Sequence, residues 1–293
     1  MRKILRSAFL LLCFSAVVTV KAQDEGLDDL LGDPGRLPVT ASFKSTRVIN
    51  SASLEITDAG TMDIKIQHRF GPLNSGAYEL WGLDASSVRI GAEWGLGGNT
   101  MIGLGRSGEG QTYDAYGKWK MFAQTRDNHI PVSVLLFSAA ALRGQALPGV
   151  NEPRGERFSY VQQLIIGRKF SDAFSMQLMP TWVHHRSPNT GGAQNLAGLG
   201  AAFRMKLSPR TSFNAEYVWF PSDRLPRGVN APLSIGFDIE TGGHVFQLHL
   251  TNSSGMADKS WLSETRGDFF RGGIRPGFNI TRVFTLWQPG KND

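Results

Sequence analysis

Residues 233–251 read LSIGFDIETGGHVFQLHLT. Large apolar side chains occupy every second position of each half, and mostly polar or small residues stand between them. Alternation with period two is typical of a β-strand that has one apolar and one polar face. Thr241 and Gly242 separate the two halves and provide a short turn. The stretch therefore predicts a hairpin of two amphipathic strands.

Similar segments recur from Thr61 to Trp287, and charged side chains fall on the polar positions of many of them. This pattern fits strands with lipid outside and a polar interior, and short turns that alternate with longer loops are typical of outer-membrane barrels. We therefore predict an all-β, antiparallel transmembrane β-barrel of 12 strands, with 14 strands as the open alternative. The short turns are expected at residues 96–98, 125–128, 171–172, 208–210 and 241–242.

The first residues are basic, and an apolar run from Ala8 to Val20 follows them. Because this run is shorter than the roughly 20 residues of a spanning helix, residues 1–22 are predicted to be a cleaved secretory signal peptide. The protein is then expected in the outer membrane of a bacterium. The further predicted parts are a periplasmic lead-in with a plug segment at 23–60, the barrel at 61–287 and a C-terminal tail at 288–293.

Charge and cysteine content exclude several classes of function. The formal net charge is +6, but four of the 31 basic residues lie in the predicted leader, which leaves 27 basic against 25 acidic residues, or +2. This balance argues against a nucleic-acid partner. The single cysteine, Cys13, also lies in the leader. We therefore expect no disulfide, no thiolate metal site and no cysteine nucleophile in the mature chain.

Residues 41–56 do not fit the count of twelve strands. Three arrangements are open for them: a periplasmic strand, a plug that enters the lumen, or an extra strand pair that raises the count to 14. We favour a segment inside or beneath the barrel.

Several segments resemble a known family. The resemblance covers most of the mature chain and rests on residues 42–50, 63–71, 103–107, 183–186, 237–252 and 278–286. These look like the Bacteroidetes outer-membrane β-barrel family known as domain of unknown function 5777. The resemblance implies a β-barrel in the outer membrane of a Gram-negative bacterium. It implies no substrate or reaction, so no catalytic residue is carried over.

Gly103, Gly105 and Gly108 spell the spacing of a dinucleotide-binding motif. That motif needs a strand before it and a helix after it, so that backbone amides can surround a pyrophosphate. Residues 101–106 are themselves strand-like, and no helix is expected after them. We therefore interpret these glycines as barrel-strand residues.

His185 and Ser187 resemble the His-x-Ser arrangement of outer-membrane phospholipase A. A serine beside a histidine base could form an acyl-enzyme. Strand parity places both side chains inward, whereas a phospholipase needs its nucleophile on the lipid side. Pro188 and the absence of a glycine after Asn189 also depart from that pattern. We expect no enzyme, and lipid hydrolysis by His185 and Ser187 is the distant alternative.

The polar parity predicts which side chains line the lumen. We expect no cofactor and no metal, since the adjacent His184 and His185 point to opposite faces of a strand. The inward charges could form a channel or ligand cavity selective for a polar solute, or they could pair with one another and fill the barrel. The lumen-lining candidates are Lys65, Arg69, Arg89, Glu93, Lys118, His185, Arg204, Glu216, Asp238, His249 and Arg275.

The sequence thus leaves two functions. The first is a restricted channel or small-ligand-binding barrel for a polar solute. The alternative is a closed structural barrel that scaffolds an envelope complex. The expected partners are outer-membrane lipid and either a small polar solute or an envelope protein.

Overall fold

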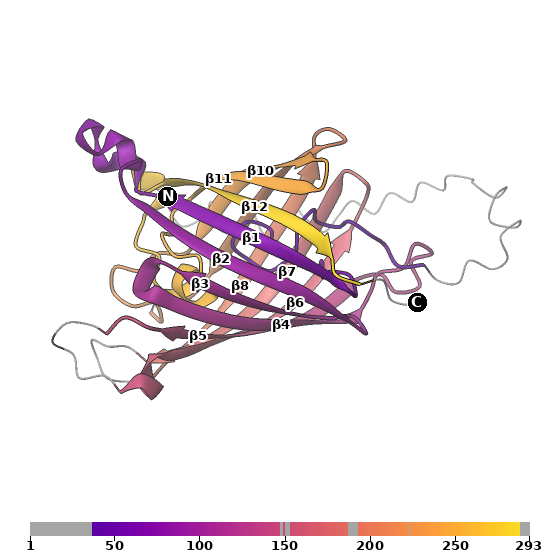
Figure 1. Cartoon of the computed structure of the whole chain (residues 1–293), viewed down its shortest axis with the longest axis horizontal. Coiled ribbons are helices and arrows are strands. Elements are labelled where there is room, and N and C mark those ends of the chain that lie inside the picture. The colour runs from indigo at the N-terminus through magenta and orange to yellow at the C-terminus, as the bar shows by residue number, and fades with distance from the viewer. Residues whose placement is uncertain (1–36, 147–148, 150–152, 187–192, 222, 288–293) are drawn as a thin grey trace, which may run out of the picture. The chain divides into compact units, whose positions relative to one another are not determined.

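The computed structural model describes residues 37–146, 149, 153–186, 193–221 and 223–287, and the described residues from Pro38 onward form one compact unit. This unit is a barrel of antiparallel strands (Figure 1). The strands are β1 (Thr61–Phe70), β2 (Ser86–Gly97), β3 (Thr100–Ser107), β4 (Thr112–Phe122), β5 (Ser133–Arg143), β6 (Phe158–Lys169), β7 (Phe174–Arg186), β8 (Ala193–Lys206), β9 (Thr211–Trp219), β10 (Leu233–Thr241), β11 (His244–Thr251) and β12 (Arg275–Thr285).

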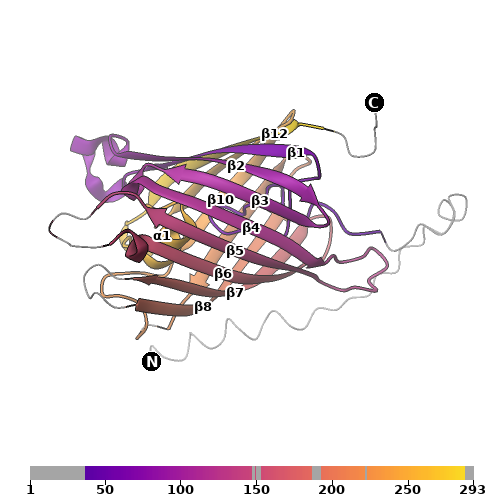
Figure 2. The same ribbon diagram turned by 60° about the horizontal axis from the view of Figure 1, so that its bottom comes forward.

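Each strand pairs with its sequence neighbour, and β1 closes the barrel by pairing with β12 (Figure 2). In the closing pair Ile66 lies opposite Ile280, and Arg69 lies opposite Gly277. The predicted antiparallel barrel and its count of twelve strands are confirmed. Closure leaves no unpaired sheet edge, which is the requirement for strands that cross a lipid bilayer.

One predicted turn lies within a longer connection. Asn128 N–H donates to the Thr125 carbonyl, so the turn expected at 125–128 is present, but the whole connection between β4 and β5 spans residues 123–132. Gln124 and Thr125 do not continue the β4–β5 ladder, because they pair with Val39 and Pro38 of the chain that leads into the barrel. Pro131 has no N–H group to donate to a ladder beside Ser133, which also delays the start of β5.

The two ends of the barrel differ. One end, here called the turn end, carries the connections at 98–99, 123–132, 170–173, 207–210 and 242–243. The opposite end, here called the loop end, carries longer connections at 71–85, 144–157, 220–232 and 252–274. These loops and the short 108–111 connection at the same end contain five 3-10 helices and one short helix: η2 (Leu73–Ser75), η3 (Ala77–Gly82), η4 (Glu109–Gln111), η5 (Arg154–Arg157), α1 (Asp258–Ser263) and η6 (Phe269–Arg271). Within the described ranges, no helix is long and apolar enough to cross a membrane.

The outward face of the strands is rich in exposed apolar side chains. Ile66, Leu104, Leu178 and Leu248 are each more than 40 % exposed, although they lie in the middle of strands. A belt of this kind is stable when the surrounding solvent is hydrocarbon. The alternation seen in 233–251 therefore has the predicted sense, with the apolar positions outside and the polar positions inside.

The inward face is divided into two walls. The charged wall consists of the inward side chains of β1, β2, β4 and β9–β12, namely Asp63, Lys65, Gln67, Arg69, Arg89, Glu93, Asp114, Lys118, Glu216, Asp238, Gln247, His249 and Asn279. The apolar wall consists of the large inward side chains of β5–β8, namely Leu135, Phe137, Val161, Ile165, Met179, Val183 and Leu196. The polar interior predicted from alternation thus covers only part of the lumen.

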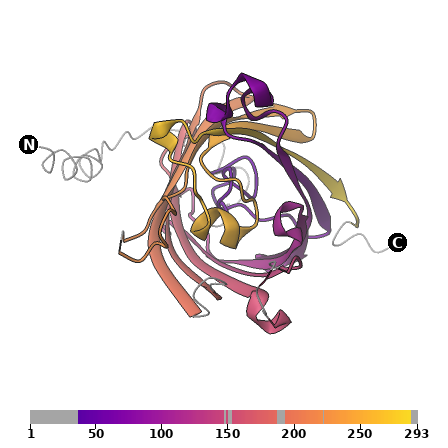
Figure 3. The same cartoon turned by 90° about the vertical axis from the view of Figure 1, so that its left-hand side faces the viewer.

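Residues 42–57, here called the inner segment, lie inside the barrel. Figure 3 looks in from the loop end and shows this chain coiled within the ring of strands, with α1 near the mouth. The inner segment is neither a periplasmic strand nor an extra strand pair of the barrel. Its only bridge is an internal one between Arg47 and Ala52, and it adds no strand to the sheet.

Candidate functional site

The inner segment makes a tight turn, and Glu216 binds the tip of this turn. Val48 N–H donates to the carbonyl of Ser51, and Ser53 N–H donates to the carbonyl of Thr46. The Glu216 carboxylate of β9 accepts from Asn50 N–H at 2.8 Å and from Ser51 N–H at 3.0 Å. Ile49 N–H and the Ser51 hydroxyl donate to it as well. One carboxylate therefore satisfies three buried backbone donors that no sheet ladder reaches.

Amide side chains of the charged wall bind the carbonyl side of the same turn. Gln247 Nε2 of β11 donates to the Val48 carbonyl at 2.7 Å, and Asn279 Nδ2 of β12 donates to the Ile49 carbonyl at 3.1 Å. The Asn50 side chain accepts from Arg69 Nη2 at 2.5 Å and donates to Ser234 Oγ at 2.8 Å. These bonds fix the turn against β1, β10, β11 and β12.

Lys118 and Glu93 bind the two limbs of the inner segment. The Lys118 ammonium donates to the carbonyls of Thr46, Ser53 and Glu55. Glu93 accepts from the Thr46 hydroxyl at 2.5 Å and from the Tyr116 hydroxyl at 2.6 Å. Because Lys118 has three rotatable donors, one side chain can join backbone groups that are far apart in the segment.

Arg47 ties the inner segment to the loop that follows β11. Its Nη1 and Nη2 donate to the two oxygens of Asp258 at 2.6 and 2.9 Å, and Nη1 also donates to the Asn50 carbonyl. Both side chains are buried, and Trp261 Nε1 donates to Asp258. The guanidinium lies 4.9 Å from the ring centroid of Tyr116. Burial opposes the charge of Arg47, but the Asp258 carboxylate outweighs it and raises the pKa of the guanidinium well above its ordinary value.

The apolar wall contacts the other side of the inner segment. Phe43, Val48 and Leu54 are almost fully buried in one cluster with Leu135 and Phe137. Helix α1 packs on β5, β6 and β7, and it adds its own Trp261 and Leu262 to this cluster. The lumen is therefore filled from the turn end by the inner segment and near the loop end by α1.

Gly103 and Gly105 of the apparent dinucleotide motif have a packing role. Arg89 forms a two-pronged ion pair with Asp114, and its Nη1 donates to Gln67. A Cβ atom at Gly105 would lie 2.2 Å from Arg89 Nη2, and one at Gly103 would lie 2.3 Å from Tyr116 Cζ. β3 therefore has glycine at these positions because the long lumen side chains of β2 and β4 occupy that space.

The structure places all eleven predicted lumen residues on the inward face. Ten of them are buried, and Arg275 is half-buried near the loop end. Glu93, Lys118 and Glu216 contact the inner segment directly, as does Arg69 through Asn50. Arg204 and Asp238 lie nearer the turn end, on β8 and β10. The prediction missed Arg47, Asn50 and Asp258, because none of them lies on a strand.

His185 lies inward on β7, where its Nδ1 contacts the Arg186 carbonyl at 3.3 Å. Ser187, the other residue of the hydrolase hypothesis, lies outside the described residues, as do the predicted signal peptide at 1–22 and the tail at 288–293. The described ranges contain no group of three or more His, Cys, Asp or Glu side chains that could hold a metal ion.

Solved porin structures are among those to which this chain is similar. The NanC porin is 7 % identical, with a TM-score of 0.48, 76 % of this chain covered and 98 % of that chain. A mutant of the Rhodopseudomonas blastica porin is 12 % identical, with a TM-score of 0.33 and coverage of 68 % of this chain and 55 % of that one. No curated protein matches this chain.

A family model described as a membrane bound beta barrel domain matches residues 43–284. The match includes nearly all of the inner segment as well as all but the final residue of the strands. This chain therefore belongs to the membrane bound beta barrel domain family, domain of unknown function 5777.

Proposed function

We propose that this protein is an outer-membrane channel for a small polar solute, and that its inner segment is a plug that holds the channel closed. The leader-like start and the apolar belt support the outer membrane as its location and membrane lipid as its surroundings. In this proposal the turn end faces the periplasm and the loop end faces the outside of the cell.

One observation carries the proposal: the inner segment fills the lumen without belonging to the barrel sheet. β1 and β12 close the barrel by themselves, and the inner segment is bound by side chains such as Glu216, Gln247 and Lys118. Withdrawal of the segment would break no strand pairing. It would expose a lumen whose charged wall can replace water around a polar solute.

The second barrier is the 252–266 portion of the β11–β12 loop. Its α1 helix is buried against the apolar wall, and its Asp258 binds Arg47 of the inner segment. The Arg47–Asp258 pair therefore links a barrier reached from the turn end to a barrier reached from the loop end. Movement of either barrier would alter the Arg47–Asp258 pair and so displace the other barrier. Gating from outside the cell requires such a link.

The test is single-channel conductance in planar bilayers. The full chain is compared with a variant in which residues 42–57 are replaced by a short Gly/Ser linker. We expect rare openings from the full chain and steady currents from the variant. A matched control replaces the exposed residues 126–129 with the same linker, and it should stay closed. Silence from all three, with correct folding shown by heat-modifiable gel mobility, would contradict the channel.

A closed scaffold for an envelope complex is the second candidate, and the 71–85 loop favours it. Tyr78 is 97 % exposed, and Leu80, Trp81 and Leu83 beside it are each more than half exposed. Leu80 and Trp81 also adopt positive φ angles of 45° and 52°. Strained exposed apolar residues on a projecting loop fit a protein contact.

Photo-crosslinking from position 78 in intact outer membranes separates the two candidates. One defined protein adduct that disappears in a Trp81→Ser variant, together with a silent linker variant, would favour the scaffold. Lipid adducts alone would leave no role for the loop as a scaffold surface.

A further inference from the structure

A row of inward side chains near the loop end has polar atoms without partners. In the strand register His249 of β11 lies opposite Gly277 of β12, Gly277 lies opposite Arg69 of β1, and Arg69 lies opposite Ser87 of β2. The buried atoms without a hydrogen-bond partner in this row are Nε of Arg69, Oγ of Ser87 and both ring nitrogens of His249. Buried polar atoms are normally paired, so a group of orphans side by side indicates a place for a ligand.

The guanidiniums here differ from those elsewhere in the lumen. Arg47 and Arg89 each have an aspartate partner. Arg69 is 1 % exposed, and its bonds go only to neutral oxygens of Asn50, Asn279 and His68. Arg275 donates to the carbonyl of Phe70. Among the described residues no carboxylate lies within ion-pair distance of Arg69 or Arg275. Two positive charges therefore stand near each other with no carboxylate in direct contact, and Glu216 and Glu109 act on Arg69 and Arg275 only from a longer distance.

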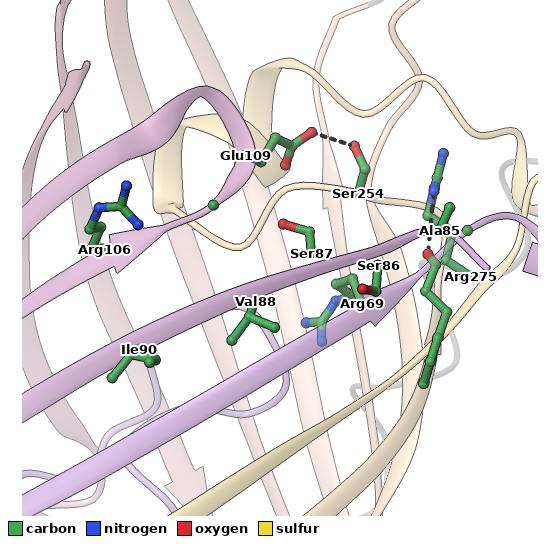
Figure 4. A pocket seen from close by; sticks show the side chains of 13 residues that line it. Arg69, Ala85, Ser86, Ser87, Val88, Ile90, Arg106, Glu109, Ser254 and Arg275 are labelled. Atoms are coloured by element: carbon green, nitrogen blue, oxygen red, sulfur yellow. Dashed lines mark hydrogen bonds between the residues drawn. The ribbon is translucent and has the colours of Figure 1, made fainter. Parts of the chain in front are cut away.

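A cavity of about 630 Å³ opens beside these groups. Figure 4 shows Arg69, Ser87 and Arg275 along it, with Glu109 and Ser254 at its rim. Glu109 is the one acid among the lining residues, and its carboxylate accepts from the Ser254 hydroxyl at 3.0 Å. Arginine is well suited to bind carboxylate and phosphate groups because its fork of donors matches two oxygens at once.

We propose that this cavity is a binding site for a small anion, with Arg69, Arg275 and Ser87 holding a phosphate or carboxylate group. The inference deepens the proposed channel, because it names an anionic solute as the class that the channel takes up from the loop end. Arg69 also donates to Asn50 of the inner segment, so an anion at this site would compete for the same guanidinium. Occupation of the site would thereby weaken one bond of the plug.

Two kinds of molecule carry such an anionic group, a free solute and a lipid with a phosphate headgroup. The cavity continues over the end of β2 to the outward face, where Val88, Ile90 and Arg106 line it. A free solute would reach Arg275 from the lumen mouth. The phosphate of a lipid headgroup would approach from the outward face, with Arg106 as a further contact. The shared chemistry is the anion, and the test distinguishes its source.

The experiment measures the affinity of inorganic phosphate for the full chain in neutral detergent, by the shift of the thermal unfolding midpoint with phosphate concentration. Chloride at equal ionic strength is the reference. We expect Arg275→Gln to weaken the affinity about tenfold, since it removes a charge-assisted contact. Glu109→Gln should strengthen it, because the only acid at the rim is neutralised. The matched control is Arg227→Gln, which removes an exposed arginine from another outer loop and should leave the affinity unchanged.

The Ser87→Ala variant tests the site without disturbing the fold. The Ser87 hydroxyl has no partner in the protein, so its removal should leave the unfolding midpoint without phosphate unchanged. It should weaken phosphate binding about threefold, as expected for one hydrogen bond. The same series is repeated in nanodiscs of phosphatidylcholine with and without phosphatidylglycerol.

A phosphate shift that Arg275→Gln reduces assigns the site to a free anion. A shift seen only with phosphatidylglycerol, and reduced by both Arg275→Gln and Arg106→Gln, assigns it to a lipid headgroup. No shift from either source, or a shift that Arg227→Gln reduces equally, overturns the site. Because this readout needs no current, a silent linker variant with intact phosphate binding would refute the channel alone.

Discussion

The charged wall and the apolar wall hold the same inner segment by different forces. On the charged side, Glu216 and Lys118 bind backbone groups of the segment one by one. On the apolar side, Leu135 and Phe137 share one buried cluster with Phe43, Val48 and Leu54, and Gln177 of β7 adds a single hydrogen bond to the Ala52 carbonyl. Hydrogen bonds weaken steeply with misalignment, whereas apolar burial tolerates small shifts.

The difference teaches how a plug can be both specific and removable. The charged wall fixes the rotation and depth of the inner segment, because a small shift would leave buried N–H groups unpaired. The apolar wall contributes area removed from water but little positional information. The charged wall therefore sets the position of the inner segment, and the apolar wall stabilises it by burial. Each variant below tests one of these two roles.

The largest effect is expected from Arg47→Ala. The change leaves Asp258 buried without its partner, which costs about 4 kcal/mol in comparable pairs. The inner segment and α1 should both loosen, and we expect frequent channel openings and a lower stability to urea in lipid vesicles. The measurement is the open fraction in planar bilayers together with the urea midpoint.

The double variant Arg47→Met with Asp258→Leu is the control for this prediction. Replacement of both partners by apolar groups of similar size is often neutral. The open fraction of the double variant should therefore be as low as that of the unchanged protein. If it opened as often as Arg47→Ala, the effect would come from lost packing with Tyr116 and Phe137 rather than from the unpaired charge.

Leu54→Ala tests the apolar wall. Leu54 is 1 % exposed and its Cδ1 packs near Gly167 of β6, so truncation leaves a cavity and costs about 3 kcal/mol. Because the polar bonds of the turn remain, we expect a lower urea midpoint with fewer openings than Arg47→Ala causes. Openings as frequent as those of Arg47→Ala would show that the two walls do not divide their roles.

Glu216→Gln tests the positional role of the charged wall with almost no change in volume. The amide keeps one oxygen for the donors of residues 49–51, but its NH₂ group faces them, at a cost of about 2 kcal/mol. We expect faster trypsin cleavage after Arg47, with a urea midpoint that falls less than it does in Leu54→Ala. The matched control is Glu240→Gln at the turn end, which should not alter cleavage at that site.

The sequence predicted the barrel because each amphipathic strand carries its own evidence. In β10 and β11 the outward Phe237 and Leu248 alternate with the inward Asp238 and His249, and period two reports this directly. The short connection at 242–243 needs positive φ angles at both glycines, which the printed sequence also signals. Local rules thus suffice for strands, turns and the lumen charges of β1, β2 and β4.

The contents of the lumen could not be predicted in the same way. Arg47 and Asp258 are 211 positions apart. Arg47 lies in irregular chain and Asp258 begins the short helix α1, so no strand periodicity marks an inward side for either. The apolar wall was hidden for a different reason. In β5 the inward Leu135 and Phe137 alternate with the outward Val134 and Leu136, so both faces are apolar and parity carries no signal.

The smallest effect is expected at the turn end, where Lys44 pairs with Glu240. Their side chains are 20 % and 32 % exposed, so water already solvates the pair and its contribution should stay below about 1 kcal/mol. Lys44→Gln should leave the open fraction unchanged at moderate salt, with at most a slight increase at low salt, where screening is weak. Conductance at two ionic strengths measures this. If Lys44→Gln opened the channel as often as Arg47→Ala does, the contacts that keep it closed would lie at the mouth of the lumen. The buried charged wall would then not set the position of the inner segment, and the proposed difference between the two walls would be wrong.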